Sequence, residues 1–486
     1  MYTKLVKQKI IGVMLIIAMV SSFCLSGCNI TFVLPSGDDD TSQTEEVTPV
    51  VTPEPVISIT DDGASLITEA DIAPKEPEYE EIYDPVGKVY SVKPASANEV
   101  TLGFVGDVGF AAGYATIRVY REKGSDIHNS MDEGVLGTMQ SMDIMMANNE
   151  FPYSDRGTPT PDKTYTFRAD PKDVHIMKDM GVDIVGIANN HAYDYGPDAL
   201  IDTIDILNDA ELPFVGAGKN IDEAMRPAYF HVNEHVISFV AATQIERYGN
   251  PDTKEATADS PGVLRTLDPA KAVKAIEEAA ANSDFTVMFV HWGTESTDLV
   301  EQSQRDLAKA YVDAGADLII GAHPHVLQGI DYIDNVPVFY SLGNFWFNSK
   351  TQDTCIVRTT LDENCAIKNV EFIPCIQRGS CVETATPTEK GRIIEYMRGI
   401  SNYADIDDNG IVTRSETDHN TQNGQNTSPY RKAPVPSENA GEGTGDVTPV
   451  QQNTEETGQI ESQGDQQPAN NVQQAEQLPD WAVDTN

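Results

Sequence analysis

The stretch VDIVGIANNH, residues 182–191, is an apolar segment that runs directly into two asparagines and a histidine. Four other apolar segments also end in Asp, Glu or His: 100–105 before Asp107, 143–147 before Glu150, 284–290 before His291, and 316–321 before His323 and His325. Short apolar runs are typical of buried strands. Because ligands bind beyond the carboxyl ends of strands in open α/β sheets, we expect these polar residues to form one site.

Helix signals separate these strands. Asp170-Pro171 and Asp268-Pro269 have the residue order expected at a helix start, and Ser303 is predicted to cap a helix that ends at Gly315. Residues 326–374 are predicted to be mostly β. Strands that alternate with helices in this way indicate an α/β fold.

The charge distribution predicts one folded domain between two disordered segments. The chain has 486 residues and a formal net charge of −43. Acidic segments rich in Pro, Thr, Ser, Gln and Asn are predicted to be a tether over 29–97 and a tail over 417–486. The folded domain is expected over 98–400, with a short hairpin over 401–416. Nucleic acid is excluded as a partner, because neutralising its phosphates requires clustered Lys and Arg.

Residues 1–28 are predicted to be an export signal. Lys4, Lys7 and Lys9 precede an apolar run over 10–20, as in a secretory signal peptide. The sequence LSGC that ends at Cys28 resembles the lipobox of bacterial lipoproteins, whose cysteine is acylated. An uncleaved signal anchor is the alternative, but the run is only about half of the ~20 residues that a membrane span needs. We therefore expect a lipid anchor on the extracytoplasmic face of the cell membrane.

The polar residues at the strand ends are potential metal ligands. They combine carboxylate, amide and imidazole donors: Asp107, Glu150, Asn190, His291, His323 and His325. This mixture suits Zn, Mn or Fe better than Ca or Mg, which prefer oxygen ligands. A divalent transition metal is therefore the predicted cofactor.

Longer motifs surround these residues. They are Gly106-Asp107, Asn148-Asn149-Glu150, ANNHAYDYG over 188–196, HWGTE over 291–295, GAHPH over 321–325 and YSLGNF over 340–345. Together they resemble the CapA family of bacterial capsule-synthesis proteins, which are associated with poly-γ-glutamate. The resemblance covers about residues 99–400. It implies a calcineurin-like metallophosphoesterase fold, which is a four-layer α/β/β/α sandwich.

The resemblance also implies roles for single residues. Asp107 would be the first metal ligand along the chain, Glu150 would bridge two metals, and His191 would protonate a leaving group. Metallophosphoesterases place a histidine two residues after the first aspartate, where this chain has Gly109. We therefore expect one tight metal and a second that is weak or absent. The expected ligands are Glu150, Asn190, His291 and His323 for the first, and Asp107, Glu150 and His325 for the second.

Four more residues are candidates for the site, each with an ordinary alternative. Asp194 would orient His191, or would be a residue at the start of a helix. Arg168, Glu295 and Asn344 are candidate substrate-binding residues. The alternatives are an exposed strand residue for Arg168, an ordinary loop carboxylate for Glu295 and a turn residue for Asn344.

Residues 405–416 match the loop template of an EF-hand, with glycine at position six and glutamate at position twelve. A β-hairpin with Asn409-Gly410 at its turn is the preferred interpretation. The polar residues from Thr417 onward do not predict the exiting helix that an EF-hand needs, so calcium is not expected here.

Four cysteines lie in the predicted domain: Cys355, Cys365, Cys375 and Cys381. An even number outside the cytoplasm allows a disulfide, such as Cys375–Cys381. Buried free thiols are the alternative. No CxxC pair is present, which argues against a zinc site formed by these cysteines.

Three functions remain open at this point. The first is a metal-dependent hydrolase or transferase that acts on a phosphoester or a γ-glutamyl amide. The second is a non-catalytic subunit of a membrane-bound capsule synthase that binds metal or an anionic polymer. A plain solute-binding lipoprotein is disfavoured, because such a protein seldom needs clustered histidines of this kind. The sequence does not separate the first two.

Overall fold

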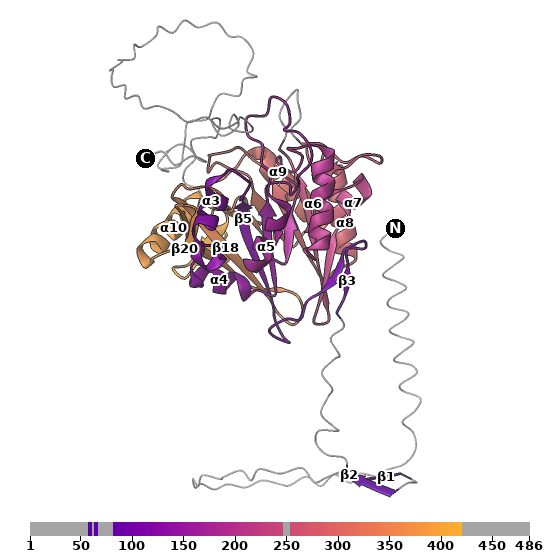
Figure 1. The fold of residues 1–486 in the computed structure, drawn as a ribbon. Helices are drawn as coiled ribbons and strands as arrows, with labels where there is room; N and C mark the ends of the chain where they lie inside the picture. The colour runs from indigo at the N-terminus through magenta and orange to yellow at the C-terminus, as the bar shows by residue number, and fades with distance from the viewer. Residues whose placement is uncertain (1–56, 61–62, 67–80, 246–252, 420–486) are drawn as a thin grey trace, which may run out of the picture. The chain divides into compact units, whose positions relative to one another are not determined.

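The computed structural model describes residues 57–60, 63–66, 81–245 and 253–419, and the fold is mixed α/β (Figure 1). The first of two eight-stranded sheets has the order β20-β19-β18-β5-β6-β7-β8, with β17 also paired to β5. The strands β5 to β8 are parallel, and β18 to β20 extend the sheet antiparallel. The bounds are β5 (Val100–Val108), β6 (Ile144–Asn149), β7 (Ile184–Gly186), β8 (Phe214–Val215), β17 (Asn344–Trp346), β18 (Gln352–Leu361), β19 (Ile367–Arg378) and β20 (Cys381–Thr384).

The second sheet has the order β15-β16-β14-β13-β11-β10-β4-β3. Its central strands β11, β13, β14 and β16 are parallel. The bounds are β3 (Tyr83–Asp84), β4 (Val89–Ser91), β10 (Ala228–Val232), β11 (His235–Thr243), β13 (Phe285–His291), β14 (Leu318–Ala322), β15 (Ile330–Ile333) and β16 (Val336–Phe339). Three two-stranded pairs complete the described strands: β1 (Ile57–Thr60) with β2 (Gly63–Leu66), β9 (Ala217–Gly218) with β12 (Gly262–Val263), and β21 (Ala404–Ile406) with β22 (Val412–Arg414).

The helices follow capping signals, with one correction. Glu301 caps α9 in a capping box with Gln304, whereas Ser303, the predicted cap, lies inside the first turn. Gly315 ends this helix at φ 109°, where a residue without a side chain is favoured. The helical segments are α3 (Ala115–Glu122), η1 (Ile127–Asn129), α4 (Glu133–Gln140), η2 (Pro171–Val174), α5 (His175–Asp179), α6 (Pro197–Asp209), α7 (Ile221–Met225), α8 (Ala270–Ala281), α9 (Gln302–Ala314) and α10 (Pro387–Ile400).

Successive residues of the second sheet face two different cores. Phe239 of β11 and Val287 of β13 belong to the same apolar cluster as Phe104 of β5 in the first sheet. Their neighbours Val240 and Met288 belong to a second cluster, which includes residues of α8 and α9. Both faces of these strands are therefore covered, which explains why the strands are continuous apolar runs in the sequence.

The folded unit begins before the predicted boundary at residue 98. Residues assigned to the end of the tether form β3 and β4, and β4 pairs with β10 at the edge of the second sheet. Tyr90 is only 3% exposed and packs on Phe230, with ring centroids 5.2 Å apart. Strands of two and three residues are too short to show a periodic pattern, so the acidic composition of this segment predicts a tether and not strands.

The predicted export signal, Cys28 and most of the tether lie outside the described residues, as does the tail from 420. Within the part of the chain that the structure describes, none of the helices has the length and apolar character of a membrane span.

The segment 401–416 contains the antiparallel pair β21 and β22. Asp407 Oδ1 accepts hydrogen bonds from the N–H groups of Asn409 and Ile411, each at 2.8 Å, so this carboxylate closes the turn. No helix follows β22 in the described residues, which end at 419.

All four cysteines of the sheet region are free and buried. In the β19–β20 hairpin, Cys375 lies opposite Thr384 and Cys381 lies opposite Arg378. The pair Cys375–Cys381 that the sequence allowed is therefore not formed, because the two residues are not partners across the hairpin. The buried free thiols are the alternative that the structure contains.

Asp183, which precedes β7, should make stability depend on pH. Burial raises the pKa of its carboxyl to about 7, although the hydrogen bond from Met145 N, at 2.8 Å, opposes this shift. In the unfolded chain the same carboxyl has its ordinary pKa of about 4. Between these values the folded state binds more protons than the unfolded state, so stability falls as the pH rises from about 4 to about 7.

Asp183→Asn should therefore raise the melting temperature at pH 8 and change it little at pH 4. Thermal unfolding followed by circular dichroism at both pH values measures this. The control is Asp209→Asn, which removes an exposed carboxylate at the end of α6. An equal gain at both pH values would contradict the assignment.

Candidate metal centre

The polar residues predicted at the strand ends lie together in the structure. Asp107 in β5 is in register with Asn148 of β6 and with Asn344 of β17. Glu150 follows β6, and His291 is the last residue of β13. All six predicted metal ligands are buried: Asp107, Glu150, Asn190, His291, His323 and His325.

Close backbone contacts position these residues. A Cβ atom at Gly106 would lie 2.0 Å from the carbonyl oxygen of Gly343, so only glycine allows the chain before β17 to approach β5 this closely. His323 and His325 both have left-handed backbone conformations, with φ of 99° and 59°. Such conformations are costly for residues with side chains and concentrate at functional sites.

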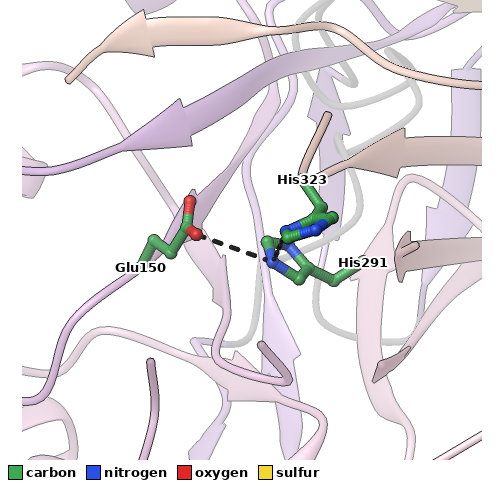
Figure 2. Close-up of side chains that lie close together, drawn as sticks. All are labelled: Glu150, His291 and His323. Carbon is green, nitrogen blue, oxygen red and sulfur yellow. Dashed lines mark hydrogen bonds and ion pairs between the residues drawn. The ribbon is translucent and has the colours of Figure 1, made fainter. Parts of the chain in front are cut away.

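Two groups of donors share Glu150. Glu150, His291 and His323 form one group and Asp107, Glu150 and His325 form the other, and within each group the potential ligand atoms lie within 4.8 Å of one another. Figure 2 shows the Glu150 carboxylate and the rings of His291 and His323 directed toward one another. His291 Nε2 lies 3.6 Å from Glu150 Oε1 and 3.1 Å from His323 Nδ1. The amide oxygen of Asn190 is 2.8 Å from the same His291 nitrogen.

One buried oxygen in this cluster fits a bound cation. Among the described residues, Glu150 Oε1 has no hydrogen-bond donor, although its side chain is fully buried. A buried carboxylate oxygen without a partner is costly, and a cation removes that cost. The mixed imidazole, amide and carboxylate donors suit a divalent transition metal. The residues present therefore fit such an ion, and the structure does not specify its identity or number.

Burial and neighbouring charges shift the pKa values of the donor residues. Burial raises the pKa of the Glu150 carboxyl well above its usual range, and the charges of Asp107 and Glu295 raise it further. Burial lowers the pKa of His291 and of His323 well below the usual range, which keeps both rings neutral and able to donate a lone pair. Burial also acts to lower the pKa of His325, but the hydrogen bond and charge of Asp107 outweigh it, so the pKa is raised.

His191 stands beside the cluster in a hydrogen-bonded chain. Its Nδ1 atom is 2.7 Å from Asp194 Oδ2, and its Nε2 atom is 4.0 Å from Glu150 Oε1. Asp194 also accepts hydrogen bonds from Phe167 N at 2.6 Å and from Lys163 Nζ at 2.5 Å. Because Asp194 accepts all three contacts, Nδ1 carries a hydrogen and Nε2 faces the cluster. Burial lowers the pKa of His191 despite the charge of Asp194.

Aromatic rings line the other side of the site. The ring of Phe167 stacks on His191 with centroids 4.0 Å apart, and Phe347 packs on His325 at 5.0 Å. A Cβ atom at Gly109 would lie 2.6 Å from the ring of Phe347. Phe347 therefore fills the space into which a side chain at position 109 would project.

The three candidate substrate-binding residues occupy different positions. Asn344 Oδ1 is 2.9 Å from His325 Nδ1, so this residue contacts a predicted ligand directly. Arg168 packs over the ring of Tyr195 at 4.1 Å and donates to the carbonyl oxygen of Arg156. Neither of these two contacts involves one of the six predicted metal ligands.

Glu295 is exposed and lies beside an open cleft of about 420 Å³ next to the donors. The walls of this cleft include Gln244, Thr294, Glu301 and His323. A carboxylate oxygen of Glu295 lies within 4.8 Å of potential ligand atoms of His323 and His325, so this side chain is close enough to contribute to a metal site.

Sequence reasoning missed several residues of the site. Asn148 Nδ2 donates to Asp107 Oδ1 at 2.7 Å and lies 3.2 Å from His291 Nδ1, so its amide connects the two sheets. The alternation along its strand offered a signal, because Asn148 precedes Glu150 by two residues. Lys163, Phe167 and Phe347 lie outside the helices and strands, and their sequence positions do not indicate that they reach the site.

Together these features describe an α/β protein with a candidate metal centre at the carboxyl ends of strands from two sheets. The family described as "Bacterial capsule synthesis protein PGA_cap" matches residues 101–349, about half of the chain. This protein belongs to that family, and the resemblance found in its motifs is thereby confirmed.

Curated relatives agree with this assignment. The "PGA biosynthesis protein CapA" of Bacillus subtilis is 34% identical over 56% of this chain and 70% of its own length. The "Capsule biosynthesis protein CapA" of Bacillus anthracis is 32% identical over 64% of this chain and 75% of its own length. A "Probable polyglutamine synthesis accessory protein" of Mycobacterium tuberculosis is 27% identical over 42% of this chain and 55% of its own length.

Proposed function

We propose that this protein takes part in the synthesis of capsular poly-γ-glutamate or a related envelope polymer. The family assignment and the names of the relatives support this proposal. The export signal and the lipobox-like sequence at Cys28 lead us to propose a lipid anchor, with the domain on the extracytoplasmic face of the membrane. The partners would be the anionic polymer or the synthase that makes it.

We also infer that the fold is a four-layer sandwich and that the protein binds one metal tightly and a second more weakly. Two sheets with apolar clusters on both faces of the second support the four-layer sandwich of calcineurin-like metallophosphoesterases. The observation that carries the metal assignment is the buried Glu150 oxygen that lacks a hydrogen bond between the two donor groups. The tight metal would be held by Glu150, Asn190, His291 and His323, and a weaker one would use Asp107, Glu150 and His325.

The chemistry proposed for this site is hydrolysis or transfer at a phosphoester or a γ-glutamyl amide. A divalent metal, when bound, supplies a Lewis acid that activates water and stabilises negative charge. His191 would exchange a proton with the reacting group at Nε2, while Asp194 fixes the ring through Nδ1. Lys163 and the N–H group of Phe167 hold Asp194 in turn.

A non-catalytic role is the second candidate, and one observation favours it. Phe347 occupies the space beside Gly109, where the related enzymes place a histidine ligand. A centre with one incomplete metal site could bind polymer or stabilise a synthase complex without turnover.

Metal analysis followed by a substrate screen separates these functions. We expect the purified full-length protein to retain a transition metal, and to cleave a simple phosphodiester or a γ-glutamyl peptide. Chelation should remove the activity, and the metal should restore it. Retained metal without turnover of either class would support the non-catalytic role, and a protein that binds no metal would overturn the proposed centre.

A further inference from the structure

The loop after β13 carries Glu295, whose carboxylate lies beside the donor cluster. Among the described residues, Glu295 has no hydrogen-bond or ion-pair partner for its carboxylate, which lies near His323 and His325. Glu301 lines the same cleft, but its carboxylate is already hydrogen-bonded. It caps α9 and accepts a hydrogen bond from Thr294 Oγ1 at 2.5 Å.

The backbone around Glu295 is built to hold this position. The next residue, Ser296, has φ of 61° and donates its N–H to the carbonyl oxygen of Pro324, at 2.8 Å. Pro324 is the residue between His323 and His325, so this hydrogen bond ties the loop to the backbone segment that carries the two histidines. Gly293, on the other side, has φ of 83°, and a Cβ there would lie 2.8 Å from Gln304 Nε2. The loop is therefore fixed against both α9 and the histidine pair.

The second metal site lacks a ligand at Gly109, and the carboxylate of Glu295 could supply one. Phe347 fills the space next to Gly109, so no ligand can reach the second metal from that position without moving the ring. Asp107, Glu150 and His325 alone would leave that metal with three protein ligands. The open cleft lies on the side of Glu295, and a fourth ligand from that side would still leave space for water or substrate.

We propose that Glu295 is a ligand of the second metal together with His325, whose potential ligand atom lies within 4.8 Å of the Glu295 carboxylate, and that it replaces the histidine absent at position 109. His323 stays with the tight metal, since its Nδ1 atom already faces His291 at 3.1 Å. This inference rests on the metal centre of the proposed function and assigns it a ligand that neither the motif comparison nor the relatives specify.

The test is the metal stoichiometry of Glu295→Gln, measured by titrating the metal-free full-length protein with Mn²⁺ or Zn²⁺. Glutamine keeps the size of the side chain and removes its charge. We expect the wild-type protein to bind two ions, and the variant to bind the second at least tenfold more weakly while the first is unchanged. Loss of a supporting residue alone typically costs about 10–100-fold in metal affinity, so loss of a ligand should reach that range.

Glu301→Gln is the matched control, because it removes the same charge from the same cleft. It should leave both affinities unchanged. Equal weakening by Glu295→Gln and Glu301→Gln would show a general effect of charge and would overturn the assignment. Two unchanged affinities in Glu295→Gln, or a single site in the wild-type protein, would also overturn it. A wild-type protein that binds no metal would instead refute the proposed centre itself.

Discussion

Replacing His323 by alanine should abolish tight metal binding by this protein. His323 Nδ1 faces the same His291 nitrogen that lies near Glu150 and Asn190, so its loss removes one donor of four. Removing a residue that only supports a ligand typically costs about 10–100-fold in affinity, and removal of a ligand should cost more. Elemental analysis of the purified variant, together with metal titration, measures this directly.

His175→Ala is the control for this experiment. His175 lies in α5, its side chain is 54% exposed, and its ring contacts Asp179 and the carbonyl oxygen of Lys172, so its loss should leave metal content unchanged. Thermal unfolding of both variants without metal tests whether the His323 variant still folds. Unchanged metal content in a folded His323→Ala protein would exclude the donor group of Glu150, His291 and His323.

The local sequence pattern predicts much of the fold and the site. Each strand that leads to the centre is an apolar run with a polar residue at its end, and both features are visible within about ten residues of sequence. Parallel strands bring their carboxyl ends to one edge, which groups Asp107 with Glu150 in the first sheet. His291 ends β13 in the second sheet, so its place beside them depends on how the two sheets pack.

Other parts of the site depend on long-range packing. Lys163 reaches Asp194 across 31 residues, and Phe347, which directly follows β17 much later in the chain, lies beside Gly109. Nothing in the flanking sequence of Lys163 distinguishes it from an ordinary loop residue. The motif YSLGNF ends two residues before Phe347, but it does not indicate which side chain packs beside Gly109. The edge strands β3 and β4 were missed for a different reason, since their few residues lie in a segment whose overall composition is acidic and rich in proline.

The same packing explains why the sequence at Gly109 indicates only that a ligand is absent. The sequence shows that Gly109 offers no ligand, but the ring of Phe347 shows that the space is filled, and the loop of Glu295 shows where another donor stands. If the proposed centre binds metal, we therefore expect the number of ions to depend on residues from three distant segments and not on Gly109 alone.

His191→Ala should keep the tight metal and suppress any turnover by about 10²–10⁴-fold, the usual range for a residue that transfers a proton. The expectation follows from geometry: Nδ1 is held by Asp194, and Nε2 faces Glu150 at 4.0 Å without belonging to either donor group around Glu150. Metal content and the rate constant for the best substrate of the screen should be measured on the same preparation.

Asp194 is a poorer residue to replace, because it also holds Lys163 and the N–H group of Phe167, and its loss would release the loop that carries both. His191 has no such second task among the described contacts of its ring, which are with Asp194, Glu150 and the face of Phe167. A large loss of rate with full metal content would therefore identify proton transfer at Nε2. An unchanged rate would remove His191 from the reaction, and an unchanged polymer-synthesis phenotype in cells carrying the variant would then favour a centre that binds without catalysing.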